Sequence, residues 1–546
     1  MKHTKRIFAM FMSLAMVMTM MIAMSATVFA AEETTYTVTI SRNSTDKAAH
    51  TYGAYQLFKG KLETVNGKKV LSDIQWGDNV DGATIITELN KIEGFNLAAN
   101  STPTQVAKAI SDKNYTNNSA EAQALAEALN KGITGSPKGT AALTKDDASG
   151  EITGLVAGYY LVKDTAAVSG EGASTKYILE VVSNVDVAEK ASVPSVDKEI
   201  AEGDGVKVAD YNIGDKIPYT ITGTLPSEFA KYNTYKTFTF KDEPSAGLTL
   251  LNGPENADKI SVKIGNDDIT SLFDISIAEN KLEVKLKDGV DLKTATHGTD
   301  NTKFAANDQI VVSYKAQLNN SAVVGGNGNI NKAKIEFSNN PNSQSSGDET
   351  GETPEDKTVV FTYTIKALKV EPTEDAAITA EAYGDLSDAE KANYVKVGDK
   401  YQKVQALEGA GFTLYKDSVS DDNKVAEITT GSTFEFKGVD VGTYILRETT
   451  VPAGYNKVPD TTITVSATYT SDKPAKINTL TVTPETAGFT ADKASGEVTG
   501  KILNEKGSVL PSTGGIGTVI FYVLGSLLVV GCGIVLISKR RMNSTK

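Results

Sequence analysis

The sequence is poor in the residues that make disulfides, metal sites and catalytic bases. Its one cysteine, Cys532, lies in an apolar run near the C-terminus, and its three histidines, His3, His50 and His297, are scattered. Disulfides are therefore excluded elsewhere, so an exported part must be stabilised by its cores or by another covalent cross-link. We find no cluster with metal-ligand spacing, no Gly-rich phosphate loop and no nucleophile elbow. We expect no metal, no cofactor and no conventional enzyme activity.

Positive charge is also in short supply. The chain has 55 Lys and Arg against 68 Asp and Glu, which gives a formal net charge of −13 at pH 7. A nucleic-acid partner needs a basic surface, so we expect none. An acidic surface is ordinary for an exported soluble protein.

Two apolar runs mark the ends of the chain. Residues 1–30 begin with Lys2, Lys5 and Arg6, continue without charge, and end in Val28-Phe29-Ala30, as a cleaved signal peptide does. An uncleaved anchor is the alternative. Residues 516–538 are uncharged and long enough to cross a bilayer core of about 30 Å, and the basic tail 539–546 follows. A basic end is held in the cytoplasm, so the rest of the chain lies outside.

The exported part is expected to be mainly β, with tandem immunoglobulin-like sandwiches. Its first domain, 31–190, mixes strands such as 36–40 and 158–162 with short helices at 103–113 and 119–133. The second and third domains, 191–345 and 358–508, have short alternating strands separated by Gly, Asn and Asp clusters. We predict strands at 216–225, 235–242, 282–286, 309–318 and 359–370. We expect the polar residues 346–357 to form a linker between the second and third domains.

Three residues on predicted strands of the third domain suggest chemistry. Lys369 lies on its first strand, Glu448 on a middle strand and Asn504 on its last strand. Burial favours a neutral lysine and a protonated carboxyl. A neutral lysine can attack the Asn side-chain carbonyl while the acid polarises it, and ammonia then leaves as an amide forms.

The segment before the second apolar run is Leu510-Pro511-Ser512-Thr513-Gly514. With the span and the basic tail behind it, it resembles the LPxTG wall-sorting signal of Gram-positive bacteria. That resemblance implies that sortase, a membrane transpeptidase, cuts between Thr513 and Gly514 and transfers the Thr513 acyl group to an amine. The chain would first be membrane-bound and then be anchored to peptidoglycan at the cell surface.

The third domain resembles the collagen-adhesin B-type terminal domain of sortase-assembled pilins. The resemblance rests on the segment 409–415, on the box 444–449 with Pro-Ala-Gly-Tyr after it, and on Asn504 ahead of the sorting signal. In that family an isopeptide bond joins a first-strand lysine to a last-strand asparagine. Here it would join Lys369 to Asn504 with Glu448 assisting, and Lys366 is the alternative lysine.

The second domain is similar to the pilin middle domain, through its opening segment 193–198 and its closing segment 331–341. The resemblance implies a bond between Lys198 and Asn331 with Asp242 as the acid. Asn339 is the rival acceptor and Glu243 the rival acid. The first domain also resembles pilin first domains, but its opening strand offers Arg42 and no lysine. A guanidinium stays protonated, so we expect no bond there.

Together these features identify the chain as similar to the backbone subunit of sortase-assembled pili. Such subunits carry Val-x-Val-Tyr-Pro-Lys after the first domain, and this chain has Val185-Asp186-Val187-Ala188-Glu189-Lys190. Lys190 is thus the expected intersubunit acceptor. Without Tyr-Pro it would be held less rigidly, and Glu189 would keep its amine charged. The implied partners are sortase, identical subunits, peptidoglycan, accessory pilins and a host surface ligand. A monomeric wall-anchored adhesin or an accessory pilin is the alternative.

Overall fold

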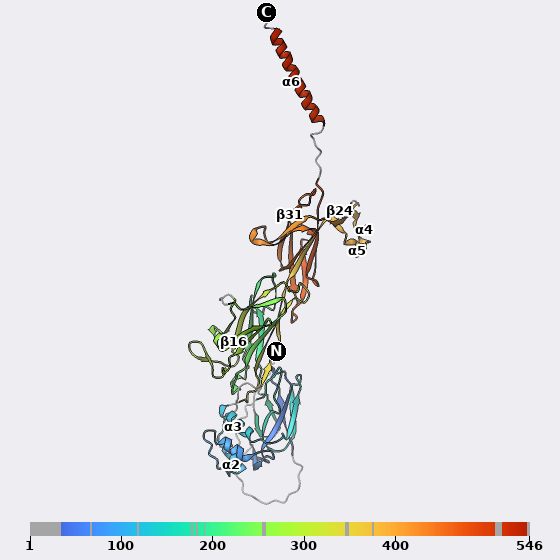
Figure 1. The fold of residues 1–546 in the computed structure, drawn as a ribbon. Coiled ribbons are helices and arrows are strands. Elements are labelled where there is room, and N and C mark those ends of the chain that lie inside the picture. The colour runs from blue at the N-terminus through green and yellow to red at the C-terminus, as the bar shows by residue number, and fades with distance from the viewer. Residues whose placement is uncertain are drawn as a thin grey trace, which may run out of the picture.

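The chain forms three β-rich bodies that follow one another in a row, and a single long helix belongs to its C-terminal end (Figure 1). This computed structural model describes residues 34–65, 68–116, 119–175, 178–181, 184–189, 192–253, 258–343, 349–373, 376–507 and 516–542. We call the bodies the first, middle and terminal domains. The predicted signal peptide, Lys190 and the LPSTG motif lie outside the described residues.

The first domain has three layers, with a five-stranded sheet in the centre. Tyr159 and Leu161 face the helices from one side of this sheet, whereas Tyr160 and Val162 face a three-stranded sheet from the other. The central sheet contains β2 (His50–Val65), β3 (Lys68–Trp76), β4 (Gly139–Leu143), β6 (Gly158–Asp164) and β7 (Ile178–Val181). The small sheet contains β1 (Tyr36–Ser41), β5 (Ser149–Leu155) and β8 (Val185–Ala188).

The helices of the first domain begin at capping side chains. They are α1 (Gly82–Leu89), α2 (Pro103–Asp112) and α3 (Ala120–Lys131). Thr102 caps α2 and Ser119 caps α3, because each side chain accepts a backbone N–H of the first turn. The two predicted helices are confirmed with slightly earlier ends. Helix α1, whose Ile85, Ile86 and Leu89 are buried, was not predicted.

The middle domain is a sandwich of two sheets around a core rich in aromatic residues. One sheet contains β10 (Val208–Asp210), β23 (Asp356–Phe361), β21 (Asn329–Ser338), β22 (Thr350–Glu352), β12 (Phe238–Pro244), β17 (Lys281–Leu286) and β16 (Phe273–Ala278). The other contains β15 (Asp267–Asp268), β14 (Ser261–Ile264), β20 (Gln309–Leu318), β13 (Leu248–Leu251), β11 (Lys216–Thr224) and β9 (Ser195–Ile200). A small ribbon is formed by β18 (Thr296–His297) and β19 (Thr302–Lys303). Tyr235, Phe238 and Phe240 lie in the core between the two large sheets of the middle domain.

The terminal domain is a second sandwich, in which the first and last long strands are parallel neighbours. Lys369 of β24 lies opposite Ile502 of β35 in this pair. Their sheet contains β24 (Tyr363–Pro372), β35 (Glu497–Leu503), β34 (Phe489–Asp492), β30 (Thr433–Val439), β27 (Lys400–Ala406), β26 (Tyr394–Val397) and β25 (Ile378–Thr379). The facing sheet contains β28 (Ala410–Lys416), β29 (Lys424–Gly431), β31 (Gly442–Thr450), β32 (Thr461–Tyr469) and β33 (Ile477–Thr483). Short helices α4 (Ala380–Gly384) and α5 (Asp388–Lys391) lie in an extension at its side (Figure 1).

The boundary between the middle and terminal domains differs from the prediction. Residues 350–352 form β22 and residues 356–361 form β23, and both pair with β21 of the middle domain. The predicted linker 346–357 is therefore wrong over these strands, because polar side chains still leave the backbone free to pair. The predicted strand 359–370 is two strands. Val360 packs in the middle core, while Val359 and Phe361 pack in the terminal core.

The mainly β prediction is confirmed, and so are most of its individual strands. Strands predicted at 216–225, 282–286 and 309–318 match β11, β17 and β20 within one residue. Near the C-terminus, α6 (Ile516–Met542) contains a stretch, Ile520–Arg540, that is long and apolar enough to cross a membrane.

Candidate functional site

A lysine, an aspartate and an asparagine meet in the core of the middle domain. Lys198 on β9, Asp242 on β12 and Asn331 on β21 are each at most 2 % exposed. Lys198 Nζ lies 2.5 Å from Asp242 Oδ1. The Tyr314 hydroxyl accepts hydrogen bonds from Lys198 Nζ and, at 3.0 Å, from Asn331 Nδ2. One hydroxyl thus connects the amine to the amide.

Strand alternation explains why these side chains point inward. On β9, Lys198 and Ile200 are buried while Asp197 is exposed. On β12, Phe240 and Asp242 are buried, while Lys241 and Glu243 are only partly buried. Side chains two residues apart lie on the same face of a strand. The alternation that buries Ile200 and Phe240 therefore also buries Lys198 and Asp242, which lie two residues away on the same face.

The environment of Lys198 favours a neutral amine. Burial lowers the pKa of Lys198, although the charge of Asp242 opposes this shift. The rings of Tyr219 and Tyr314 lie 4.9 and 5.0 Å from Nζ. Within the described part of the chain, Asp242 Oδ2 and Asn331 Oδ1 are buried and accept no hydrogen bond. The aspartate can therefore take a proton, and the amide carbonyl has an oxygen available for polarisation.

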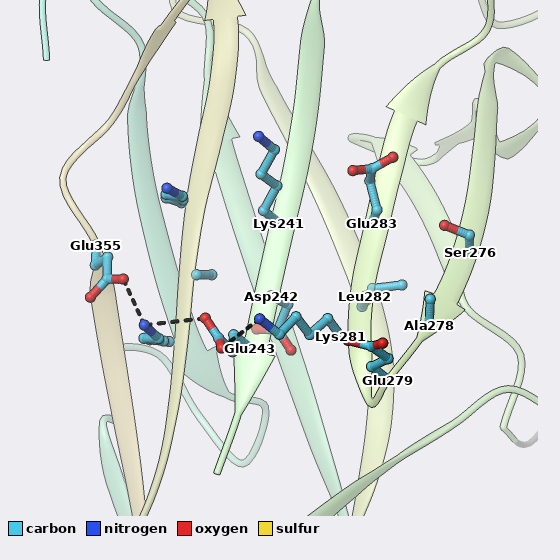
Figure 2. A pocket seen from close by; sticks show the side chains of 13 residues that line it. Lys241, Asp242, Glu243, Ser276, Ala278, Glu279, Lys281, Leu282, Glu283 and Glu355 are labelled. Carbon is cyan, nitrogen blue, oxygen red and sulfur yellow. Dashed lines mark hydrogen bonds and ion pairs between the residues drawn. The ribbon is translucent and has the colours of Figure 1, made fainter. Parts of the chain in front are cut away.

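The rival residues of this domain are used elsewhere. Glu243 faces outward, where its carboxylate is 2.9 Å from Lys281 Nζ and 3.2 Å from Lys332 Nζ (Figure 2). These lysines lower the pKa of Glu243. Asn339 is buried, but its Nδ2 donates to Val168 O at 2.6 Å, in the first domain. The geometry therefore favours Asp242 and Asn331 over Glu243 and Asn339.

The terminal domain holds a similar group of three. Lys369 and Glu448 are fully buried, Asn504 is 1 % exposed, and Lys369 Nζ lies 3.1 Å from Glu448 Oε1. Glu448 Oε2 is fixed by the backbone N–H of Val458 at 2.8 Å. Burial lowers the pKa of Lys369, against the effect of Glu448. The Phe412 ring centroid lies 5.4 Å from Nζ.

Parallel pairing brings Asn504 beside Lys369. Because Lys369 pairs with Ile502, Asn504 follows two residues later, directly after the end of β35, and its N–H donates to Val370 O at 2.8 Å. Glu448 comes from β31 in the facing sheet. Lys366 is half-buried on the opposite face of β24, away from this group. Because side chains alternate between the two faces of a strand, Lys366 points away from Glu448 and Asn504, and Lys369 is the favoured nucleophile.

Both groups contain the side chains that amide formation needs. In such a reaction the lysine nitrogen would attack the asparagine Cγ, one lysine proton would pass to the leaving amino group by way of the acid, and the C–N bond to that group would break. The products are a secondary amide and ammonia, and no oxidant is needed. The fold supplies the proximity that such a reaction otherwise lacks.

The first domain contains a polar cluster that the sequence analysis missed. Asp46, His50 and Glu189 are at most 4 % exposed, and one ligand atom of each lies within 4.8 Å of the others. His50 Nδ1 lies 2.8 Å from Asp164 Oδ1. Burial tends to lower the pKa of His50, but Asp164 and Asp46 raise it to about 10. The close spacing of Asp46 and His50 was the available signal, but Glu189 is brought to them only by folding.

Glu189 is buried beside the segment that precedes the predicted acceptor. Its carboxylate accepts hydrogen bonds from the Tyr52 hydroxyl and from the backbone N–H of Asn43, the latter at 2.6 Å. The effect of Glu189 on the amine of Lys190 stays a prediction, because Lys190 lies outside the described residues. The Arg42 guanidinium donates hydrogen bonds to the backbone carbonyls of Ala48 and Thr144, at 2.8 and 2.7 Å. Lys190, Thr513 and Gly514 lie outside the described residues.

Two family models match parts of the chain. Residues 393–480 match a prealbumin-like fold domain, within the terminal domain. Residues 503–544 match the LPXTG cell wall anchor motif. The chain therefore carries a C-terminal wall anchor that includes the apolar helix α6, and it is a cell-surface protein.

One relative and two solved structures illustrate the similarity. The trypsin-resistant surface T6 protein of Streptococcus pyogenes serotype M6 is 27 % identical over 453 residues, which cover 69 % of this chain and 75 % of the relative. The solved T6 backbone pilin of that species is 19 % identical with a TM-score of 0.49, covering 88 % of this chain and 100 % of that one. The major pilin SpaD of Corynebacterium diphtheriae is 17 % identical with a TM-score of 0.45, covering 89 % and 100 %.

Proposed function

We propose that this wall-anchored chain is the major, backbone subunit of a sortase-assembled pilus of a Gram-positive bacterium. The observation that carries the proposal is the cell wall anchor at 503–544, placed directly after a domain with a buried lysine, acid and asparagine. The surface T6 protein, its sequence relative, is described as a backbone pilin in its solved structure. The chain is thus a structural subunit, and its own chemistry is confined to cross-linking itself.

Assembly would join Thr513 of one subunit to Lys190 of the next. Sortase cleaves the Thr513–Gly514 bond, holds the Thr513 acyl group as a thioester, and passes it to the lysine amine. A head-to-tail contact of this kind repeats without closing and therefore makes a filament. The last subunit would be passed to peptidoglycan instead. Accessory pilins and a host surface ligand remain further expected partners.

Internal cross-links would stabilise each subunit. Lys198 and Asn331 would form one amide with Asp242 as the acid, and Lys369 and Asn504 a second with Glu448. Burial, the lowered lysine pKa values and the acid contacts described above support both. The first domain offers Arg42 instead of a lysine, and no such bond is proposed there.

Replacement of Lys190 tests the fibre. In Lys190→Ala and Lys190→Arg, the high-molecular-weight ladder of wall extracts on a denaturing gel should disappear, while the monomer stays exported and wall-linked. Lys47→Ala, at an exposed lysine of the same domain, is the matched control and should leave the ladder intact. A persistent ladder in both Lys190 variants contradicts this acceptor, and tandem mass spectrometry of the Thr513 junction then identifies the true one.

Replacement of Thr513 tests sorting independently. Thr513→Ala should leave the protein in the membrane or the medium, because sortase has no Thr513–Gly514 bond to cleave. Undiminished attachment to peptidoglycan in this variant would contradict the sorting step. If wild-type cells show wall attachment but no ladder, the protein is a monomeric adhesin and not a backbone pilin.

A further inference from the structure

The buried cluster of the first domain has the geometry of a metal site. His50 Nε2 lies 3.2 Å from Asp46 Oδ1 and 3.5 Å from Glu189 Oε1. A tetrahedral zinc ion with bonds of about 2.0–2.1 Å holds its ligand atoms roughly 3.3 Å apart. Neither oxygen lies where a hydrogen bond from Nε2 would point, and within the described residues this buried nitrogen has no hydrogen-bond partner. A buried imidazole nitrogen without a partner, close to an oxygen of each carboxylate, has an unused coordination position.

The groups around these three residues match a metal's outer shell. His50 Nδ1 is 2.8 Å from Asp164 Oδ1, the carboxylate contact that usually orients a metal-binding histidine. Asp46 accepts the backbone N–H groups of Ala48 and Ala173, each at 2.9 Å. Glu189 Oε2 accepts the N–H of Asn43, and Tyr52 stacks on the His50 ring with centroids 5.2 Å apart. The ligands are therefore held in place before any ion binds.

Carboxylates gather around His50 from several parts of the domain. Asp46, Asp164 and Glu189 lie in or beside the cluster, and Arg42 Nη1 lies 3.6 Å from Asp46 Oδ1. Carboxylate oxygens and an imidazole nitrogen are the ligand types that bind a divalent transition metal.

We propose that Asp46, His50 and Glu189 bind a divalent transition-metal ion of the zinc class, with a fourth position for water. One imidazole and two carboxylates suit zinc or manganese. Calcium takes six to eight oxygen ligands and is not expected to prefer this site. The ion would join the loop after β1 to the segment that ends at Glu189, directly before Lys190. The proposal does not depend on fibre assembly.

Metal content of the full chain, purified in detergent, tests the site. The protein is stripped with a chelator, equilibrated with ZnCl₂, MnCl₂ or CaCl₂, passed through a desalting column and analysed by plasma mass spectrometry. Wild-type protein should retain one zinc per chain, and calcium should not be retained. A wild-type chain that retains neither zinc nor manganese overturns the proposal and leaves a proton as the occupant of Nε2.

Variants assign the bound ion to this cluster. His50→Gln should retain no zinc, whereas His297→Gln, at the middle-domain histidine paired with Asp267 at 2.7 Å, should retain one. Glu189→Gln keeps one oxygen to accept the Asn43 N–H, and the Tyr52 hydroxyl can accept from the new amide N–H, so it should fold. It should bind zinc at least about tenfold more weakly because an amide is a poorer ligand. Equal zinc in wild type, His50→Gln and Glu189→Gln places the ion elsewhere and contradicts the proposal. X-ray absorption of the wild-type zinc form should show one imidazole among oxygen ligands, and a shell without imidazole also contradicts it.

Discussion

The middle and terminal domains assemble the same three chemical groups in different ways. In the middle domain the lysine stands on one sheet, on β9, while the aspartate and the asparagine stand on the other, on β12 and β21. In the terminal domain, Lys369 and Asn504 come from neighbouring parallel strands of one sheet, and Glu448 reaches them from the facing sheet. The reaction therefore depends on a shared buried position and not on one strand arrangement.

The identity of each acid follows from this difference. Packed sheets lie about 10 Å apart, so a group that crosses the gap must be long. In the terminal domain the acid crosses, and it is a glutamate. In the middle domain the lysine crosses, and the acid, which pairs directly across from Ala333 of the asparagine strand, is the shorter aspartate.

Removing either acid should have the largest effect. Asp242→Ala and Glu448→Ala should each prevent the amide of their own domain and leave a buried lysine without its partner. Loss of a cross-link over so long a loop costs about 2–5 kcal/mol, and the free lysine adds to this because it must be buried without a partner. The deficit of the intact mass from the mass of the variant's own sequence should shrink by one ammonia, and calorimetry should show one destabilised transition. A variant that keeps the wild-type deficit contradicts the role of that acid.

Removal of the asparagine that accepts the lysine should make the stability of each domain depend on pH. Asn331→Ala and Asn504→Ala leave free lysines whose pKa is lowered by burial. Such a lysine binds fewer protons when folded than when unfolded. Its destabilisation is absent above the unfolded pKa of about 10.4 and grows as pH falls toward the lowered folded pKa. Stability of both variants, measured by denaturant titration, should rise from neutral pH toward pH 10. The cross-linked wild type should lack this rise, and an identical profile in wild type and variant contradicts the bond.

Removing the bridging hydroxyl should separate the two domains. Tyr314→Phe deletes the oxygen that contacts both Lys198 and Asn331, so bond formation in the middle domain should slow by about tenfold, the equivalent of one hydrogen bond in a buried site. The terminal group uses no contact with Tyr314. Peptide mapping of freshly synthesised protein should show a delayed Lys198–Asn331 link and an unchanged Lys369–Asn504 link. Equal delays in both would mean that the hydroxyl acts only through general stability.

The smallest effect is expected at the alternative lysine. Lys366→Ala should leave the mass deficit unchanged, because Lys366 lies on the other face of β24. A change at a half-buried site without special contacts stays within about 0.5 kcal/mol. Intact mass and thermal unfolding, compared with wild type, check this. Loss of the terminal amide in this variant would exchange the roles of the two lysines.

Much of the fold was predictable because short sequence patterns specify many of its strands and helices. Alternating strands such as β20 and capped helices such as α2 carry their signal within a few residues. The boundary at Thr362 was not predictable, since a polar sequence gives no sign that 350–352 and 356–361 will pair with β21. Short α1 lacked enough turns to show a period.

The residues of the candidate sites also divide into those that the sequence could predict and those that it could not. Lys369 could be named because apolar neighbours on alternate positions place it inward, and the resemblance supplied its partners. Tyr314 could not, because its hydroxyl reaches the middle group only through the packing of β20 against β21. In the cluster of Asp46, His50 and Glu189, the first two lie four residues apart, but Glu189 is far along the chain and is brought to them only by folding.

The parallel pairing of β24 and β35 decides how the terminal domain responds when the molecule is pulled lengthwise. Tension enters at Thr362, where β23 of the middle domain leads into β24, and leaves beyond β35 toward the anchor. Parallel neighbours pulled from opposite ends load all their ladder hydrogen bonds at once. A covalent bond from Lys369 to Asn504 would shorten the stretched path to residues 363–369 of β24 and the last residues of the domain. The strands between them, including the whole facing sheet, would then carry no tension and stay folded under load.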